Sequence, residues 1–361
     1  MVPITGEFQA ESPLHPAAAA LLAESFARGW ADPHKLHRAS RQAGILLAEA
    51  KEIYARHLGI RSDWIHFLGE PDLGFHLGIS GLLLPNSTLF YTTTDREEVL
   101  ALVQSPLARL NSLQIPVDRF GQVDTTQLEA QSQDVLIWQL ANGETGTVRE
   151  PLSGRAGFSG SLFIDATASG AEVALPSTFS CALWDAQTWA GPTGLGILAI
   201  DPQSQWRNPL PSLSATQLLG SFSIPLALSG AVALEHWISD RASQRAKLTE
   251  MNLHIRNFLQ VEISDVDIVE TSPTILLDRL SFSFLYVDAE QLVNEMSANG
   301  YSVDSGSACA SSNVEFSHVL AAMGYLTHGN IRMRLRNDIT WPDVHQFLST
   351  LKSVVEKLRT I

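Results

Sequence analysis

The sequence predicts an α/β protein with a large, mainly parallel mixed sheet between helices and a smaller α+β C-terminal domain. Short apolar runs alternate with helical or longer connections over about 200 residues, a pattern typical of parallel strands joined by helical crossovers. A chain of 361 residues favours two domains over one. A long helical stretch at about 225–260 separates the two parts. We therefore predict a large domain over 15–240 and a small domain formed by 1–14 and 241–361.

The N-terminal part is expected to begin with an irregular arm, followed by two helices. Pro16 suits the first turn of a helix, and a second helix over about 40–58 has Gly59 as a plausible stop. The first helix is expected to place four apolar residues on one side: Leu21, Leu22, Phe26 and Trp30.

The predicted strands are short apolar runs at 64–68, 88–92, 134–141 and 161–166, and in the C-terminal part at 261–270 and 279–287. A helix is expected near 288–298. Thr340 can cap a final helix with Pro342 in its first turn. Its buried stripe is expected to contain Phe347, Leu351, Val354, Val355 and Leu358.

Composition narrows the classes of function. The formal net charge of −14 argues against general binding to nucleic acids or anionic membranes. No apolar run is long enough to span a bilayer, and two cysteines exclude a disulfide framework. The eleven histidines show no metal-binding spacing. We expect a cytoplasmic protein with no bound metal.

The stretch 181–200 is the most informative part of the chain. It consists of an apolar run, a turn containing Gly191-Pro192, Gly194 and Gly196, and a second apolar run. This composition predicts a strand, a Gly/Pro-rich turn and another strand.

That stretch resembles the cofactor segment of the class V aminotransferase and cysteine desulfurase family. In this family, a strand ends in His-Lys, two residues before Gly-Pro, and the lysine forms a Schiff base with pyridoxal phosphate. Further similar segments occur in the family's order: 31–38, 141–146, 162–166, 304–312 and 330–334. The resemblance covers about residues 15–360 and implies the fold of type I pyridoxal-phosphate transferases and a homodimer.

The resemblance assigns cofactor positions, and the decisive one lacks its reactive group. Thr188 occupies the lysine position, and a threonine has no amine to form a Schiff base. Asp165 corresponds to the acid that pairs with the pyridine nitrogen. Asn142 corresponds to a retained asparagine, although it could equally belong to a turn. Ser223 corresponds to a phosphate-binding hydroxyl donated by a neighbouring subunit.

The other cofactor positions are also altered. Arg96 stands where the family has a ring-stacking histidine, but the run around it is better explained as an exposed helix start. Asp72 and Pro71 stand at the helix start that holds the phosphate, where one adds negative charge and the other lacks an N–H donor. From these losses we expect no cofactor in this protein.

Two residues could retain chemistry. Cys309 lies at the position of the family's persulfide cysteine, among small residues. It is either a thiol that forms or accepts a persulfide or a small buried side chain. Arg332 lies at the position of the arginine that binds the substrate carboxylate.

Three functions therefore compete. The first is a non-catalytic regulatory, scaffold or sulfur-relay homologue with a partner in sulfur transfer or iron–sulfur assembly. The second is an enzyme that uses the cleft for another small ligand, with Cys309 and Arg332 as its reactive pair. The third is an aminotransferase or cysteine desulfurase with weakly held pyridoxal phosphate.

Overall fold

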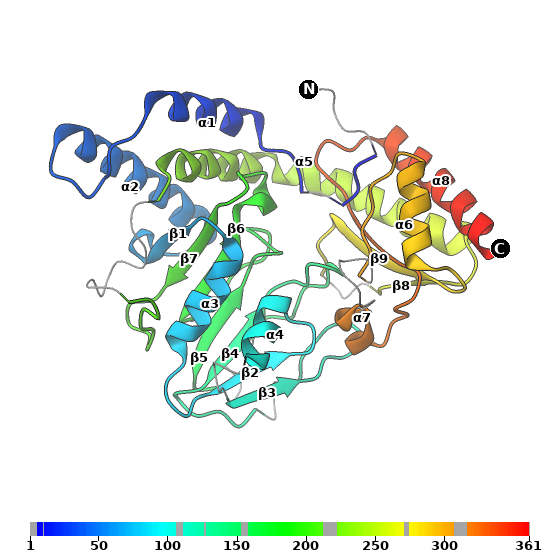
Figure 1. Ribbon diagram of the computed structural model, residues 1–361, viewed down its shortest axis with the longest axis horizontal. Coiled ribbons are helices and arrows are strands. Elements are labelled where there is room, and N and C mark those ends of the chain that lie inside the picture. Colours follow the sequence, from blue (N-terminus) through cyan, green and yellow to red (C-terminus); the bar gives the residue numbers. More distant parts are fainter. Residues whose placement is uncertain are drawn as a thin grey trace.

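The structure, a computed structural model, describes residues 6–9, 11–105, 111–125, 128–152, 158–211, 222–270, 274–306 and 316–360. Within them lie a seven-stranded sheet and a three-stranded sheet, each packed against helices that bury its apolar side chains (Figure 1). The predicted α/β class with a large, mostly parallel mixed sheet is confirmed.

The large sheet contains β1 Ile65–Leu68, β2 Thr88–Thr92, β3 Asn111–Ile115, β4 Val135–Gln139, β5 Ser161–Asp165, β6 Cys181–Asp185 and β7 Gly196–Ile200. The strand order is β1-β7-β6-β5-β4-β2-β3. The pairs among β2 to β6 are parallel, whereas β7 runs antiparallel to both β6 and β1. The carboxyl ends of β2, β4, β5 and β6 therefore meet at one edge of the sheet, which is where open α/β sheets bind ligands.

Two helical layers cover this sheet. They are α1 Pro16–Arg28, α2 Arg38–Leu58 and the first half of α5 Ile224–Glu262 on one side, and α3 Pro71–Leu82 and α4 Glu97–Gln104 on the other. Successive strand residues point to opposite faces of the sheet and pack against different helical layers. Trp184 of β6 packs with α2 and α5, and Leu183 packs with α3. A Cβ on Gly74 would lie 2.3 Å from Leu183 Cδ1, so this glycine lets α3 approach the sheet closely.

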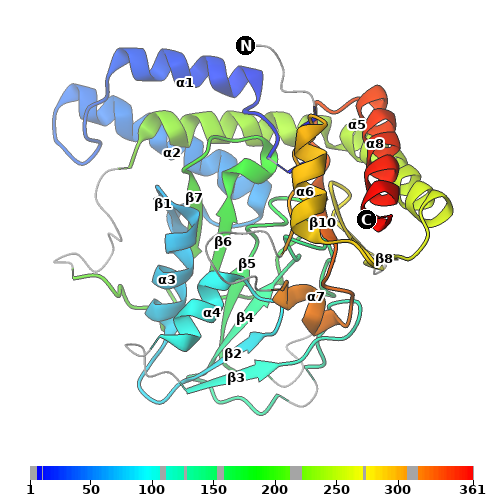
Figure 2. The same cartoon turned by 45° about the vertical axis from the view of Figure 1, so that its right-hand side comes forward.

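The small sheet has the order β10-β9-β8 and is antiparallel. Its strands are β8 Val266–Ile268, β9 Arg279–Phe284 and β10 Asn330–Arg334, and the nearby helices are α6 Ala289–Ala298, α7 His318–Met323 and α8 Trp341–Arg359. Figure 2 shows α6 and α8 beside this sheet, together with the second half of α5. The predicted stripe of α8 is buried at Phe347, Leu351, Val354 and Val355.

Helix α5 connects the two cores. Ala227 and Leu234 pack in the core of the large sheet, whereas Met251 and Leu259 pack in the core of the small sheet. The predicted domain boundary near residue 240 falls inside this continuous helix, so the division into 15–240 and 241–361 with 1–14 stays a prediction. No helix in the described ranges is long and apolar enough to cross a membrane.

The apolar residues predicted on one side of α1 are not its most buried residues. Phe26 is 59% exposed, and the buried residues of this helix are Ala18 and Ser25. Helix α1 packs on α5, where the Ser229 hydroxyl donates to the Ala18 carbonyl oxygen. The small side chain of Ala18 allows that close contact.

One strand histidine makes stability depend on pH. His66 of β1 is largely buried opposite Leu198, and burial, followed by the nearby charge of Lys51, lowers its pKa from 6.5 to about 4. The folded state therefore binds fewer protons than the unfolded state between about pH 4 and 6.5, and stability falls as the pH drops through that window. At about 1.4 kcal/mol for each pKa unit, the loss by pH 4 is about 3 kcal/mol.

We expect His66→Gln to remove most of this loss, as measured by urea unfolding at pH 7 and pH 4.5. Replacing the exposed His76 of α3 by Gln controls for the number of histidines. An acid sensitivity that persists unchanged in His66→Gln would contradict the assignment.

Candidate functional site

The candidate site begins at Asp165, the last residue of β5. Its side chain is buried, and its Oδ1 accepts hydrogen bonds from the Thr167 amide at 2.9 Å and the Thr167 hydroxyl at 2.6 Å. Its Oδ2 accepts from Gln139 Nε2 at 3.3 Å. Gln139 ends β4 directly opposite Asp165 in the parallel register. The strand ends therefore hold this carboxylate in a fixed position.

Asn142 joins the same network. Its Nδ2 donates to Gln139 Oε1 at 3.2 Å and to the Thr94 carbonyl oxygen at 3.1 Å. Its Oδ1 accepts from the backbone amides of Glu144 and Thr145, both at 3.0 Å. The side chain thus builds the turn and links it to β4. The structure brings Asn142 and Asp165 together through Gln139, a residue that the sequence interpretation missed.

Arg96 is a partly exposed cation beside the Asp165 network. It precedes α4, donates from Nη1 to the Thr167 hydroxyl at 3.2 Å, and lies over the Phe75 ring at 5.6 Å. Its guanidinium also contacts Glu98 at 3.2 Å and Asp72 at 3.6 Å. Burial, followed by the charge of Glu98, raises the pKa of Asp72. The cation at this position is therefore shared among carboxylates of the protein.

Helix α3 begins beside Asp72 with features that oppose an anion. Pro71 occupies the first turn and has no N–H to donate, and Glu70 is the N-cap residue. Asp72 adds a carboxylate to that first turn. A phosphate at this helix start would meet fewer donors and more negative charge than an ordinary helix N-terminus offers.

Thr188 lies in the short 3-10 helix Ala186–Trp189 that follows β6. Its hydroxyl donates to the Asp185 carbonyl oxygen at 2.7 Å. A Cβ on Gly170 would lie 2.3 Å from Thr188 Oγ1, so the chain passes this residue closely. Burial raises the pKa of the Asp185 carboxyl, which caps the turn by accepting from the Gln187 amide at 2.9 Å.

The five lysines of the sequence all lie among the described residues. Lys51 donates to the Ile65 carbonyl oxygen at 2.7 Å, and Lys247 donates to that of Asn337 at 2.9 Å. The remaining three lie elsewhere: Lys352 pairs with Glu262, Lys357 pairs with Glu295, and Lys35 is exposed.

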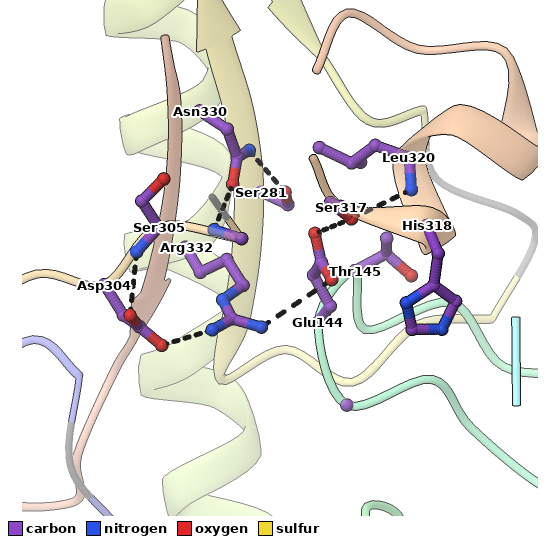
Figure 3. A network of polar contacts seen from close by, with 12 residues as sticks. Glu144, Thr145, Ser281, Asp304, Ser305, Ser317, His318, Leu320, Asn330 and Arg332 are labelled. Atoms are coloured by element: carbon purple, nitrogen blue, oxygen red, sulfur yellow. Dashed lines mark hydrogen bonds and ion pairs between the residues drawn. The ribbon is translucent and has the colours of Figure 1, made fainter. Parts of the chain in front are cut away.

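Arg332 belongs to a second cluster, on β10 (Figure 3). Its Nη2 contacts Asp304 Oδ2 at 2.5 Å, and its Nη1 lies 3.6 Å from Glu144 Oε2. Glu144 is buried and also accepts from the Ser317 hydroxyl at 2.6 Å. Burial raises the pKa of Glu144, whereas Arg332 and then Ser317 act to lower it. The guanidinium thus lies between two carboxylates of the protein.

Cys309 lies outside the described residues, in the gap 307–315. On one side of the gap, the Gly306 amide donates to Asn330 Oδ1 at 3.1 Å. On the other side, Ser317 contacts Glu144. Both ends of the cysteine segment are therefore tied to the Arg332 cluster. Ser223 is the N-cap residue of α5, and its side chain makes no cap hydrogen bond to the described helix.

A buried arginine behind the Asp165 network was missed by the sequence interpretation. Arg149 is 6% exposed, lies over the Trp138 ring at 5.1 Å, and donates to the Thr92 hydroxyl at 3.1 Å. Burial raises the pKa of neighbouring Asp95 to about 6, although Arg149 acts to lower it. No spacing in the sequence could have revealed this pair, because only the fold brings the two residues together.

The described residues contain no cluster of three or more potential metal-ligating side chains. Cys181 is fully buried in β6, and burial raises the pKa of its thiol well above the ordinary value. It packs as an apolar residue of the sheet.

Comparisons with known proteins agree with this architecture. No protein-family model matches the chain. The cysteine desulfurase IscS of Dictyoglomus turgidum is 27% identical over 385 residues, covering 98% of this chain and 95% of that protein. A cysteine desulfurase of Nostoc sp. is 25% identical over 352 residues, covering 92% of this chain and 88% of that protein.

Solved structures show the same fold. A NifS-like protein superposes with a TM-score of 0.86 at 19% identity, covering 98% of this chain and all of the other. The apo structure of a cysteine desulfurase from Thermococcus onnurineus superposes with a TM-score of 0.82 at 16% identity, covering 98% of this chain and 95% of the other. The predicted resemblance to this family and its fold is confirmed.

The expectation of no cofactor is wrong, because the relatives are cysteine desulfurases, which bind pyridoxal phosphate. The residues present fit part of this group. Asp165 is a buried carboxylate suited to an acid beside a pyridine nitrogen. The start of α3 does not suit a phosphate, and Thr188 does not suit a covalent link. The altered positions therefore do not exclude the cofactor.

Proposed function

Because this protein is cysteine desulfurase-like in sequence and fold, we propose that it serves sulfur or iron–sulfur metabolism without forming the desulfurases' covalent bond to pyridoxal phosphate. In that role it is a non-catalytic regulatory, scaffold or sulfur-relay homologue. It works in the cytoplasm as a homodimer, beside a partner protein of sulfur transfer or iron–sulfur assembly.

Thr188 is the observation that carries this proposal. We take it to stand at the position of the cofactor lysine, in the turn between β6 and Gly191-Pro192. Its hydroxyl is bonded to the Asp185 carbonyl oxygen, and an alcohol cannot replace the amine in bonding to the cofactor's aldehyde. The described lysines have partners or positions elsewhere, which supports the absence of a substitute amine.

The surroundings of Arg332 also support a non-catalytic role. A substrate carboxylate at this guanidinium would have to compete with Asp304 at 2.5 Å and Glu144 at 3.6 Å. Both carboxylates are attached to the protein, so their local concentration far exceeds that of a free ligand. Arg332 is better suited to holding the ends of the Cys309 segment, and Cys309 would then be the relay thiol if sulfur is transferred.

Asp165 favours a second candidate, in which catalysis persists with pyridoxal phosphate held without a covalent bond. The carboxylate is buried and fixed by Thr167 and Gln139, which is the arrangement that a ring-nitrogen acid requires. This candidate predicts that L-cysteine is converted to alanine when the cofactor is added, and that its sulfur is released as sulfide when a dithiol reductant is also present.

We expect the purified protein mixed with pyridoxal phosphate to show no Schiff-base absorption band, and to carry no cofactor fixed to the chain after borohydride. The physical reason is that borohydride fixes only cofactor that is bonded to an amine, and none is placed to react. The measurement combines the visible spectrum, mass spectrometry of the reduced chain and a sulfide assay with L-cysteine and a dithiol reductant.

A reduced adduct traced to one lysine would overturn the proposal and move the active site to that residue. Sulfide release without such an adduct would favour the second candidate. No reduced adduct together with no sulfide release would support the non-catalytic role.

A further inference from the structure

Helices α5 and α8 bring two histidines together outside both clusters described above. The ring centres of His254 on α5 and His345 on α8 lie 5.1 Å apart, with the ring planes at 70°. Trp341, one turn before His345 on α8, lies 5.6 Å from each of the two rings. Figure 2 shows α8 packed beside the second half of α5. The fold thus joins two imidazoles that are far apart in the sequence.

Both imidazoles are accessible and have uncommitted nitrogens. His345 is exposed and His254 is half-buried. Within the described ranges, no hydrogen bond or ion pair involves the ring nitrogens of either residue. Other histidines use a ring nitrogen inside the fold: Nδ1 of His15 accepts from the Ala17 amide, and Nδ1 of His37 accepts from the Ser40 amide. The nitrogens of His254 and His345 are therefore available to a ligand.

The separation of the two rings is the separation that a shared metal ion requires. An ion bound tetrahedrally by two imidazole nitrogens at about 2.0–2.1 Å holds the two ring centres roughly 5 Å apart. The observed 5.1 Å matches this value. Rotation about the Cβ–Cγ bond turns a ring nitrogen toward the ion and leaves the ring centre nearly in place. The backbone therefore needs no rearrangement to form the site.

A second pair of imidazoles in the chain lacks this geometry. The ring centres of His15 and His236 lie 4.3 Å apart, with the ring planes at 15°. Rings stacked face to face direct their nitrogens side by side and not toward one point. This pair, which also includes a residue of α5, is therefore a natural comparison for the pair on α5 and α8.

The ligand type selects the class of ion. Imidazole nitrogen suits zinc, copper and nickel, whereas magnesium and calcium prefer oxygen ligands. In the described part of the chain, no third histidine, cysteine or carboxylate completes a cluster with the two rings. Water would fill the remaining coordination positions, so the site is open and its ion can exchange with the solution.

We propose that His254 and His345 form a binding site for a divalent transition-metal ion of the zinc, copper and nickel class. The ion links the start of α8 to α5, and α8 carries Phe347 and Leu351 into the core of the small sheet. An ion that binds only this folded arrangement stabilises it, so the metal strengthens the attachment of α8. No residue of the Asp165 network or of the Thr188 turn takes part, so the site is independent of the proposed function.

The test is isothermal titration calorimetry of the full chain, without an affinity tag, with zinc chloride and separately with magnesium chloride. We expect saturable binding of zinc and no binding of magnesium. His254→Gln and His345→Gln should each weaken zinc binding roughly tenfold or more, because one imidazole alone lacks the second, tethered ligand. The matched control is His236→Gln, the same substitution on the same helix, which should leave zinc affinity unchanged.

Trp341 provides a readout at the site itself. Copper(II) bound between the two imidazoles should quench the fluorescence of this neighbouring indole. Trp341→Phe should remove that part of the quenching and leave zinc affinity unchanged, because the indole is not a ligand. Zinc should also raise the melting temperature of the native chain, but not that of His254→Gln or His345→Gln.

Four results would overturn the proposal. These are no saturable zinc binding by the native chain, magnesium binding as tight as that of zinc, native zinc affinity in a folded His254→Gln or His345→Gln, or an equal loss of affinity in His236→Gln. Melting temperatures measured without metal show whether the variants are folded. All of these measurements omit pyridoxal phosphate, so their failure would leave the Thr188 proposal untouched.

Discussion

Replacing Thr188 by lysine is expected to give a protein that takes up pyridoxal phosphate covalently. The substitution supplies an amine in the turn after β6, and an amine there can bond to the cofactor's aldehyde. We expect a new absorption band and a borohydride-stable adduct at position 188, with labelling roughly ten times or more that of the native chain. The lost hydroxyl bond to Asp185 should cost only about 1 kcal/mol of stability.

The matched control is Thr193→Lys, in the same Gly/Pro-rich turn but exposed. It adds the same amine five positions later. The comparison therefore tests whether labelling by the cofactor requires the amine at position 188 or only an added lysine in this turn. If a folded Thr188→Lys gains no more adduct than Thr193→Lys, Thr188 does not stand at the cofactor position, and the proposed function loses its main support.

Replacing Arg149 by methionine is expected to destabilise the protein by about 3–5 kcal/mol, because the change leaves buried carboxylates without their buried cation. Arg149 is 6% exposed, and Asp95 and Asp165 are 1% and 2% exposed. The substitution also removes donors to the hydroxyls of Thr92 and Thr94. Urea unfolding measures the loss.

The stability lost in Arg149→Met should increase with pH. The pKa of Asp95 is already raised to about 6 in the folded state, and removing Arg149 raises it further. The folded state then binds more protons than the unfolded state above about pH 4, so stability falls as the pH rises. The destabilisation caused by Arg149→Met should therefore be larger at pH 8 than at pH 5.

Arg119→Met is the control for that measurement. Arg119 also lies over an aromatic ring, 4.2 Å from the Tyr325 centroid, and pairs with Glu270 at 2.9 Å, but its side chain is 45% exposed. An exposed ion pair contributes about 1 kcal/mol or less. Equal losses from the two substitutions would mean that burial does not set the contribution of Arg149.

Local patterns in the sequence were enough to predict the main elements. The apolar runs became β1, β2, β4 and β5, and the stretch 181–200 became a strand, a turn and a strand. The final helix buries the expected residues because helical periodicity is a property of neighbouring positions. The pattern in α1 did not reveal its buried side, because the contact of Ala18 with distant α5 decides which side is buried.

The candidate site likewise combines features that the sequence determines with features that only the fold creates. The sequence by itself determined that Thr188 carries no amine, that only five lysines exist, and that the chain has the order of motifs found in the cysteine desulfurases. The bond from Gln139 to Asp165, the pairing of Arg332 with Glu144, and the approach of His254 on α5 to His345 were decided only by the tertiary structure. Each joins side chains far apart in the sequence, and their charges and hydrogen bonds act only after parallel strands and α5 bring them within a few ångströms.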